Sequence, residues 1–110
     1  MSSLSTHVLD AVRGEPAAGV QVELSSSTDD GWVTIGSGVT DADGRITDLA
    51  PGEIIPGVYR LVFATGTYFR TSGTVGFYPE VVISFEVDEE RHYHVPLLLS
   101  PYAFSTYRGS

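Results

Sequence analysis

A chain of 110 residues, 42% of them apolar, can bury one hydrophobic core, and its length predicts a single domain over residues 1–110. It contains no cysteine, which excludes a disulfide framework and a thiolate metal site. Its formal net charge of −8 at pH 7 would repel phosphate backbones and anionic lipids, so we expect neither nucleic acid nor a membrane as a partner.

The chain shows no segment that predicts export or membrane insertion. None of its apolar runs approaches the roughly 20 residues that are needed to cross a bilayer. Residues 1–4 lead straight into a strand-like run and lack the basic end and long apolar stretch of a signal peptide. We therefore expect a cytoplasmic protein.

Short runs of alternating apolar and polar residues, separated by Gly, Pro and Asp, are the main pattern in the chain. A period of two places alternate side chains on one face of a β-strand, as for Val20, Val22 and Leu24. The predicted strands include residues 20–24, 32–36, 59–63, 81–87, 92–99 and 102–108. The predicted turns and loops between them include residues 25–27, 30–31, 41–44 and 88–90.

Seven or eight short strands with frequent turns predict a β-sandwich. Only residues 64–71 offer a short helix. Gly66 and the β-branched threonines in that segment have low helix propensity, so propensity leaves the helix open.

Residues 92–99 form the most informative run. Their alternation assigns Tyr93, Val95, Leu97 and Leu99 to the core face, and places His92 and His94 on the opposite face. Together with His7, this His-x-His pair has the composition of a zinc site with one open position. Such pairs more often lie at interfaces or bond locally, so spacing alone favours a site without metal.

Three other features bear on chemistry. Residues 41–44 resemble the start of a calcium loop but lack the third oxygen ligand and the distant glutamate, so a turn is the better interpretation. Arg45 follows that turn, where most arginines are solvated. The last predicted strand runs almost to Ser110, although chain ends are usually frayed, which indicates a docked C-terminus.

Four segments resemble the signatures of the 5-hydroxyisourate hydrolase family. Residues 4–10 (LSTHVLD) resemble the first signature, and residues 92–101 (HYHVPLLLSP) resemble the second. Residues 40–45 (TDADGR) resemble the internal turn motif, with Asp41 where many members carry Asn. Residues 107–110 (YRGS) resemble the C-terminal tetrapeptide that marks the family, which is the most specific of these matches.

The resemblance implies an all-β, transthyretin-like fold of about eight strands, in two four-stranded sheets, with one short helix after the fifth strand. It implies hydrolysis of 5-hydroxyisourate to 2-oxo-4-hydroxy-4-carboxy-5-ureidoimidazoline, in urate degradation towards allantoin, with no metal or other cofactor. It also implies a homotetramer, a dimer of dimers, with active sites where the dimers meet.

The same resemblance assigns roles to individual residues. His7 and His94 would orient and deprotonate the attacking water, since imidazole has the one unperturbed side-chain pKa suited to this task near pH 7. Arg45 would hold the flat, oxygen-rich substrate with its forked donors. His92 is given an interfacial or surface position. The substrate pocket would be completed by three residues of the tail: Tyr107, Arg108 and Ser110.

The main alternative is a non-catalytic ligand carrier like transthyretin, the sister group. Transthyretin lacks the residues that match His7, Arg45 and His94, and it lacks the terminal tetrapeptide. All four features are present here, so the resemblance favours an enzyme. A third interpretation, a surface interaction module, leaves the histidines and the docked terminus without a role.

Overall fold

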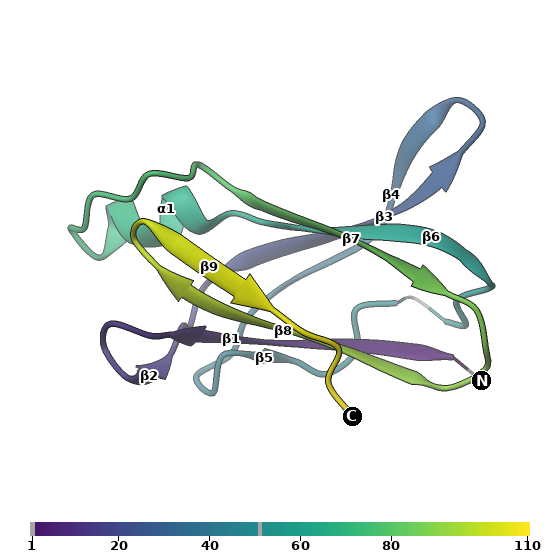
Figure 1. The fold of residues 1–110 in the computed structure, drawn as a ribbon, viewed down its shortest axis with the longest axis horizontal. Coiled ribbons are helices and arrows are strands. Elements are labelled where there is room, and N and C mark those ends of the chain that lie inside the picture. The colour runs from purple at the N-terminus through teal and green to yellow at the C-terminus, as the bar shows by residue number, and fades with distance from the viewer. Residues whose placement is uncertain (1, 51) are drawn as a thin grey trace.

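The computed structural model describes residues 2–50 and 52–110, which form two β-sheets packed face to face with one short helix at the side (Figure 1). Within this part of the chain, no helix is long and apolar enough to span a membrane. The elements, in chain order, are β1 Ser3–Asp10, β2 Glu15–Pro16, β3 Gln21–Thr28, β4 Gly31–Val39, β5 Arg45–Ile46, β6 Gly57–Phe63, α1 Thr65–Thr71, β7 Val81–Val87, β8 His92–Ser100 and β9 Ala103–Thr106.

The first sheet has the order β2-β1-β8-β9, with β5 pairing with β1 beside β2, and the second has the order β4-β3-β6-β7. β1 and β8 run parallel, whereas the other pairs are antiparallel. The expected sandwich is confirmed. The expected two four-stranded sheets become a five-stranded and a four-stranded sheet among the described residues, because β5 adds a two-residue strand.

The core lies between the sheets and is built from alternate residues of each strand. The predicted inward set on β8 is confirmed, since Tyr93, Val95, Leu97 and Leu99 are all buried. Each fully buried apolar side chain of this size stabilises the fold by roughly 1.5–3 kcal/mol relative to exposure. The inward residues of the facing sheet include Val22, Leu24, Leu61, Phe63 and Val81.

The predicted helix forms over Thr65–Thr71, although its sequence has low propensity. Packing explains it, because Phe69 is buried and the Gly66 N–H donates to the Pro79 carbonyl at 2.9 Å. A Cβ on Gly66 would lie 3.0 Å from Pro79 Cα, so glycine permits this close approach. The helix follows the sixth strand rather than the fifth, and two of the six strands before it, β2 and β5, have only two residues each.

Two local predictions were wrong. Residues 25–27 were expected in a loop, but they belong to β3, where Ser25 and Ser26 pair with both β4 and β6. A register shift between Leu24 and Ser25 marks a β-bulge, which lets the polar run continue the strand beyond the core. The last strand was expected over residues 102–108, but β9 ends at Thr106.

Candidate active site

The parallel pairing of β1 with β8 brings the two ends of the chain together on the outer face of the first sheet. Ser3 lies opposite His92 and Ser5 lies opposite His94. Their neighbours along the strands, such as Leu4 and Tyr93, are buried in the core. Because side chains alternate across a strand, the serines and histidines face away from the core.

Hydrogen bonds hold both histidines of β8 against β1. The Ser5 hydroxyl lies 2.8 Å from His94 Nδ1 and 2.8 Å from His92 Nε2. The Ser3 hydroxyl lies 2.5 Å from the other ring nitrogen of His92. His94 is half-buried and His92 is exposed. The sequence indicated the face of both histidines correctly, but nothing in it indicated that Ser5 links them.

β5 brings the arginine of the turn motif beside the first histidine. Arg45 lies directly opposite His7 in the antiparallel pairing of β5 with β1. His7 Nε2 lies 2.9 Å from the carbonyl oxygen of Asp43, so the turn itself orients this ring. Arg45 is exposed and His7 is half-buried. The two predicted site residues therefore do share one surface.

The turn before Arg45 is fixed by its first residue. Asp41 Oδ1 accepts hydrogen bonds from the backbone N–H groups of Asp43, at 2.9 Å, and of Arg45, at 3.0 Å. Gly44 adopts φ +75°, and a Cβ there would overlap the Val8 carbonyl oxygen. Asp41 acts here only as an acceptor, which explains how an aspartate serves where many family members carry Asn.

The C-terminal tail crosses directly over His94. The Gly109 N–H donates to the His94 carbonyl at 2.8 Å, and the two residues form a β-bridge. A Cβ on Gly109 would overlap Cδ2 of the His94 ring, so glycine is required for this crossing. Tyr107, Arg108 and Ser110 are exposed beside it. The docked terminus is confirmed, and Gly109 is a site residue that the sequence interpretation did not single out.

Electrostatics favour the neutral form of His94. Burial lowers the pKa of His94 below its usual value, and the nearby charges of His7, His92 and Arg45 lower that pKa further. A hydrogen bond from the His94 ring to the backbone of Ser5 partly opposes this effect. His94 is therefore largely an uncharged imidazole near neutral pH, which is the state that a general base requires.

A hollow of about 170 Å³ marks the site, below the roughly 300–1,000 Å³ of most ligand pockets. No group of three His, Cys, Asp or Glu side chains in residues 2–50 and 52–110 is arranged to hold a metal ion. The hollow is lined by Ser5, Thr6, Arg45, Ile46, Thr47, His92 and His94.

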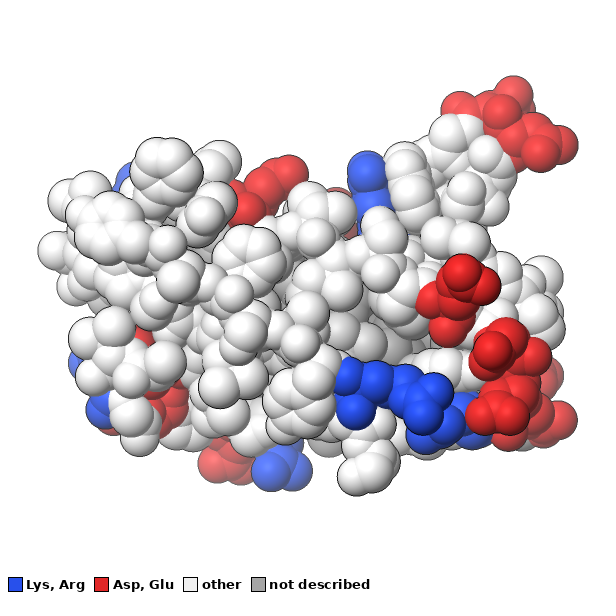
Figure 2. Space-filling view, in the orientation of Figure 1, with Lys and Arg blue, Asp and Glu red and all other residues white. Residues whose placement is uncertain are grey.

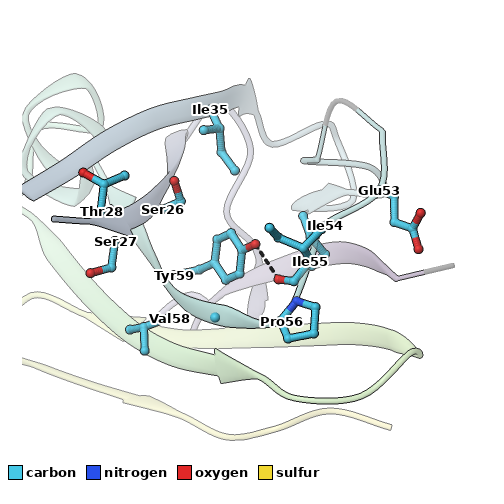
Figure 3. A pocket seen from close by; sticks show the side chains of 11 residues that line it. Ser26, Ser27, Thr28, Ile35, Glu53, Ile54, Ile55, Pro56, Val58 and Tyr59 are labelled. Atoms are coloured by element: carbon cyan, nitrogen blue, oxygen red, sulfur yellow. Dashed lines mark hydrogen bonds between the residues drawn. The ribbon is translucent and has the colours of Figure 1, made fainter.

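A larger hollow of about 490 Å³ lies elsewhere, between the end of β3 and the segment that leads into β6 (Figure 3). Its walls are mostly apolar, and Glu53 supplies the carboxylate at its rim. The hydroxyl of Tyr59 is occupied by a 2.6 Å hydrogen bond to the Ile55 carbonyl. Its lining residues include neither an imidazole nor a guanidinium, so it lacks the groups that hydrolysis of an anion needs.

A two-sheet sandwich with histidines, an arginine and a docked tail on one sheet face defines a transthyretin-like protein. The chain belongs to the HIUase/Transthyretin family, whose model matches residues 4–109. A 5-hydroxyisourate hydrolase of Salmonella typhimurium is 49% identical over 109 residues, covering 97% of this chain and 80% of the relative. The mouse 5-hydroxyisourate hydrolase is 42% identical over 113 residues, covering 99% and 96%.

Solved structures of both branches of the family resemble this fold. The 5-hydroxyisourate hydrolase of Klebsiella pneumoniae has a TM-score of 0.89 at 40% identity, covering 100% of this chain and 94% of that one. Sea bream transthyretin in complex with thyroxine has a TM-score of 0.91 at 39% identity, covering 97% and 94%. The fold alone therefore does not separate hydrolase from carrier, and the site residues must do so.

Proposed function

We propose that this protein hydrolyses 5-hydroxyisourate, opening its six-membered ring to give 2-oxo-4-hydroxy-4-carboxy-5-ureidoimidazoline in urate degradation towards allantoin. Relatives that carry the name 5-hydroxyisourate hydrolase at 42–49% identity over nearly the whole chain support this activity. One structural observation carries the proposal: His7, Arg45, His94 and the tail lie on the same sheet face.

The reaction needs a base near neutral pH, a cation for an anionic substrate, and donors for the oxyanion that forms on the attacked carbonyl. His94, with its lowered pKa, takes a proton from the attacking water, and His7 helps to orient that water. Arg45 holds the substrate through its forked donors. Although the net charge is −8, Figure 2 shows basic side chains gathered beside the C-terminal end of the chain.

The tail completes the substrate pocket. Gly109 anchors it to His94, and in this proposal the exposed side chains of Tyr107 and Arg108 add to the walls of the pocket around that ring. Tyr107 offers a hydroxyl donor, Arg108 a second guanidinium, and the Ser110 carboxylate an acceptor that can orient an imidazole.

A homotetramer, a dimer of dimers, forms the working enzyme in this proposal, with each site enclosed where two dimers meet. The hollow of one chain is smaller than most ligand pockets, which supports this arrangement, because a second subunit would supply the remaining walls around the substrate. Sedimentation equilibrium should give four times the chain mass of 11.8 kDa. The proposal also takes residues 1–110 as one domain that acts in the cytoplasm, which fractionation of the source cells tests.

The direct test is to mix the protein with freshly made 5-hydroxyisourate and to follow its ultraviolet absorbance against spontaneous decay. His94→Ala should lower kcat by about 10²–10⁴-fold, the usual contribution of a general base. Asp29→Asn, on the exposed turn between β3 and β4, is the matched control and should keep the wild-type rate. A wild-type protein that does not exceed the spontaneous rate would refute the proposal.

The second candidate is a ligand carrier, and the likeness to sea bream transthyretin with thyroxine favours it at the level of fold. A carrier needs an apolar channel of fitting shape, and it needs neither paired imidazoles nor a guanidinium. Tight thyroxine binding by isothermal calorimetry, without hydrolysis of 5-hydroxyisourate, would identify a carrier.

A further inference from the structure

Four side chains on the outer face of the first sheet form a continuous hydrogen-bonded chain. In order, they are Ser3, His92, Ser5 and His94, with contacts of 2.5, 2.8 and 2.8 Å between successive polar atoms. His94 lies at the half-buried end of this chain, beneath the tail, and His92 is exposed. This series of hydrogen-bonded side chains therefore runs from the centre of the site towards solvent.

The Ser5 hydroxyl restricts where the hydrogens of this chain can lie. A hydroxyl has one hydrogen to donate and can accept two more. Ser5 contacts a ring nitrogen of each histidine, so at most one of the two nitrogens receives its hydrogen and the other must donate. The protonation states of His92 and His94 are therefore coupled through Ser5.

Two orders of hydrogens leave His94 Nε2 free to act as a base, because Ser5 can either accept from both histidines or accept from His94 and donate to His92. Only the second order connects all four side chains in one direction, so that a proton can pass from His94 to His92. His94 must then carry its hydrogen on Nδ1 and donate it to Ser5, and Ser5 donates in turn to His92 Nε2. His92 is left with its hydrogen on Nδ1, which donates to Ser3. Every contact in the chain is satisfied in this order, and every donor points towards the exposed end.

The proposed reaction releases a proton, which this series of hydrogen-bonded side chains can carry away. Hydrolysis adds water across the ring C–N bond: oxygen bonds to carbon, and one hydrogen goes to the leaving nitrogen. The new carboxyl group ionises at neutral pH, so each turnover releases one proton. A proton held on His94 would lie among the charges of His7, Arg45 and His92, which disfavour a cation there.

We propose that Ser5 and His92 are positioning residues that fix the tautomer of His94 and pass the proton released in each turnover from His94 to solvent. This inference rests on the proposed function. When His94 Nε2 gains a proton, its Nδ1 proton moves to Ser5, and the Ser5 proton moves to His92 Nε2. This leaves His94 neutral with its hydrogen on Nε2, and exchange with solvent returns the hydrogen to Nδ1 before the next turnover. His92 then carries the charge at the surface, beside Arg91, whose guanidinium is engaged with Glu89.

Variants of Ser5 test the fixing of the tautomer. Ser5→Ala should lower kcat by about 10–100-fold, the cost measured when a group that orients a metal-bound histidine is removed, with KM nearly unchanged. Ser5→Thr keeps the hydroxyl and should restore most of kcat. Ser37→Ala, the same change on the exposed part of β4, is the control. Wild-type kcat in Ser5→Ala, or equal losses in both Ser5 variants, would overturn the proposal.

A variant of His92 tests the transfer of the proton. His92→Gln can accept the hydrogen bond from Ser5 but cannot take up a proton. Its kcat should fall in dilute buffer and recover when imidazole is added, because a small base in solution then replaces the lost acceptor. A loss that imidazole does not relieve, or no loss in dilute buffer, would overturn the proposed transfer.

Nitrogen-15 NMR of histidine-labelled protein tests the order of hydrogens without measuring activity. Neutral His94 should carry its hydrogen on Nδ1 in the wild type and shift towards Nε2 in Ser5→Ala. A wild-type His94 with its hydrogen on Nε2 would refute the inference even in an active enzyme. The expected tautomer in a protein that does not hydrolyse 5-hydroxyisourate would support the hydrogen order and refute the proposed function.

Discussion

His92 and His94 are two positions apart on one strand face, yet their surroundings give them different chemistry. His94 is half-buried, lies beneath the tail and contacts one serine, whereas His92 is exposed and contacts two. His7 differs again, because its Nε2 faces a carbonyl oxygen, which can only accept. Its Nε2 must therefore carry a hydrogen. Among the three histidines, the lowered pKa of His94 makes it the best candidate for the general base.

The pH dependence of kcat/KM tests this assignment. A base acts in its neutral form, so activity should rise with pH through the pKa of His94 and level off above it. Because burial and nearby charges lower that pKa, the midpoint of the rise should lie below the reference value of 6.5. His92→Gln removes one of those charges and should move the midpoint to higher pH, still below 6.5 because burial, the largest cause, remains. A wild-type midpoint above 6.5 would contradict the assignment.

At the scale of elements, the sequence predicted each strand face better than it predicted which strands meet. Alternation within residues 92–99 correctly separated core from surface, because that property is local to one strand. The pairing of Ser5 with His94 joins residues 89 positions apart, and its register depends on the whole fold. His7, Arg45 and His94 were singled out through motif resemblance, and their roles stay a prediction. The contacts of Ser5 and Gly109 with His94 follow from no local pattern.

The crossing of the tail over β8 can be tested by replacing Gly109, the residue that lies on the His94 ring. Gly109→Ala would place a Cβ on the His94 ring, so either the ring or the tail must move. We expect kcat/KM to fall by at least about tenfold, since small displacements of catalytic groups are costly, while the melting temperature changes little. Ser105→Ala, on exposed β9, is the control and should match the wild type. Unchanged activity in Gly109→Ala would remove the tail from the site.

Helix α1 is anchored to β1 by one buried carboxylate. The Tyr68 hydroxyl donates to Asp10 Oδ2 at 2.8 Å, and Asp10 Oδ1 accepts from the backbone N–H groups of Val12 and Arg13, at 3.1 Å each. Asp10 is only 4% exposed. Burial raises the pKa of Tyr68, and its bond to Asp10 raises that pKa further, so the phenol stays protonated and keeps donating.

Tyr68→Phe should therefore lower the free energy of unfolding by about 1.5–3 kcal/mol, the range for a hydrogen bond to a charged group. Urea unfolding followed by circular dichroism measures this as a lower midpoint at an unchanged slope. Tyr102→Phe is the matched control, because Tyr102 is 67% exposed on the turn between β8 and β9. Equal midpoints for the two variants would show that the Asp10 contact does not stabilise the helix.

At the scale of the whole molecule, the surface supports an assembly. β4, β7 and β9 lie at sheet edges, and exposed edges tend to pair with other chains. Several large apolar side chains near β7 and β9 are also exposed, among them Phe77 at 70% and Tyr107 at 60%. Aromatic residues of this kind are enriched at protein interfaces. These features fit the proposed tetramer, in which the shallow site of one chain is covered by another.

An enclosed site between subunits predicts that specific activity depends on protein concentration. On serial dilution, the rate per chain should fall in parallel with the tetramer fraction measured by mass photometry or light scattering, by mass action. Protein crosslinked at high concentration and then diluted should keep its full rate, which separates dissociation from loss of protein on surfaces. A constant rate per chain in a sample shown to contain only 11.8 kDa monomers would mean that one chain holds the complete site. In that case the small hollow beside His94 would itself have to hold the substrate, with the tail bridged to His94 at Gly109.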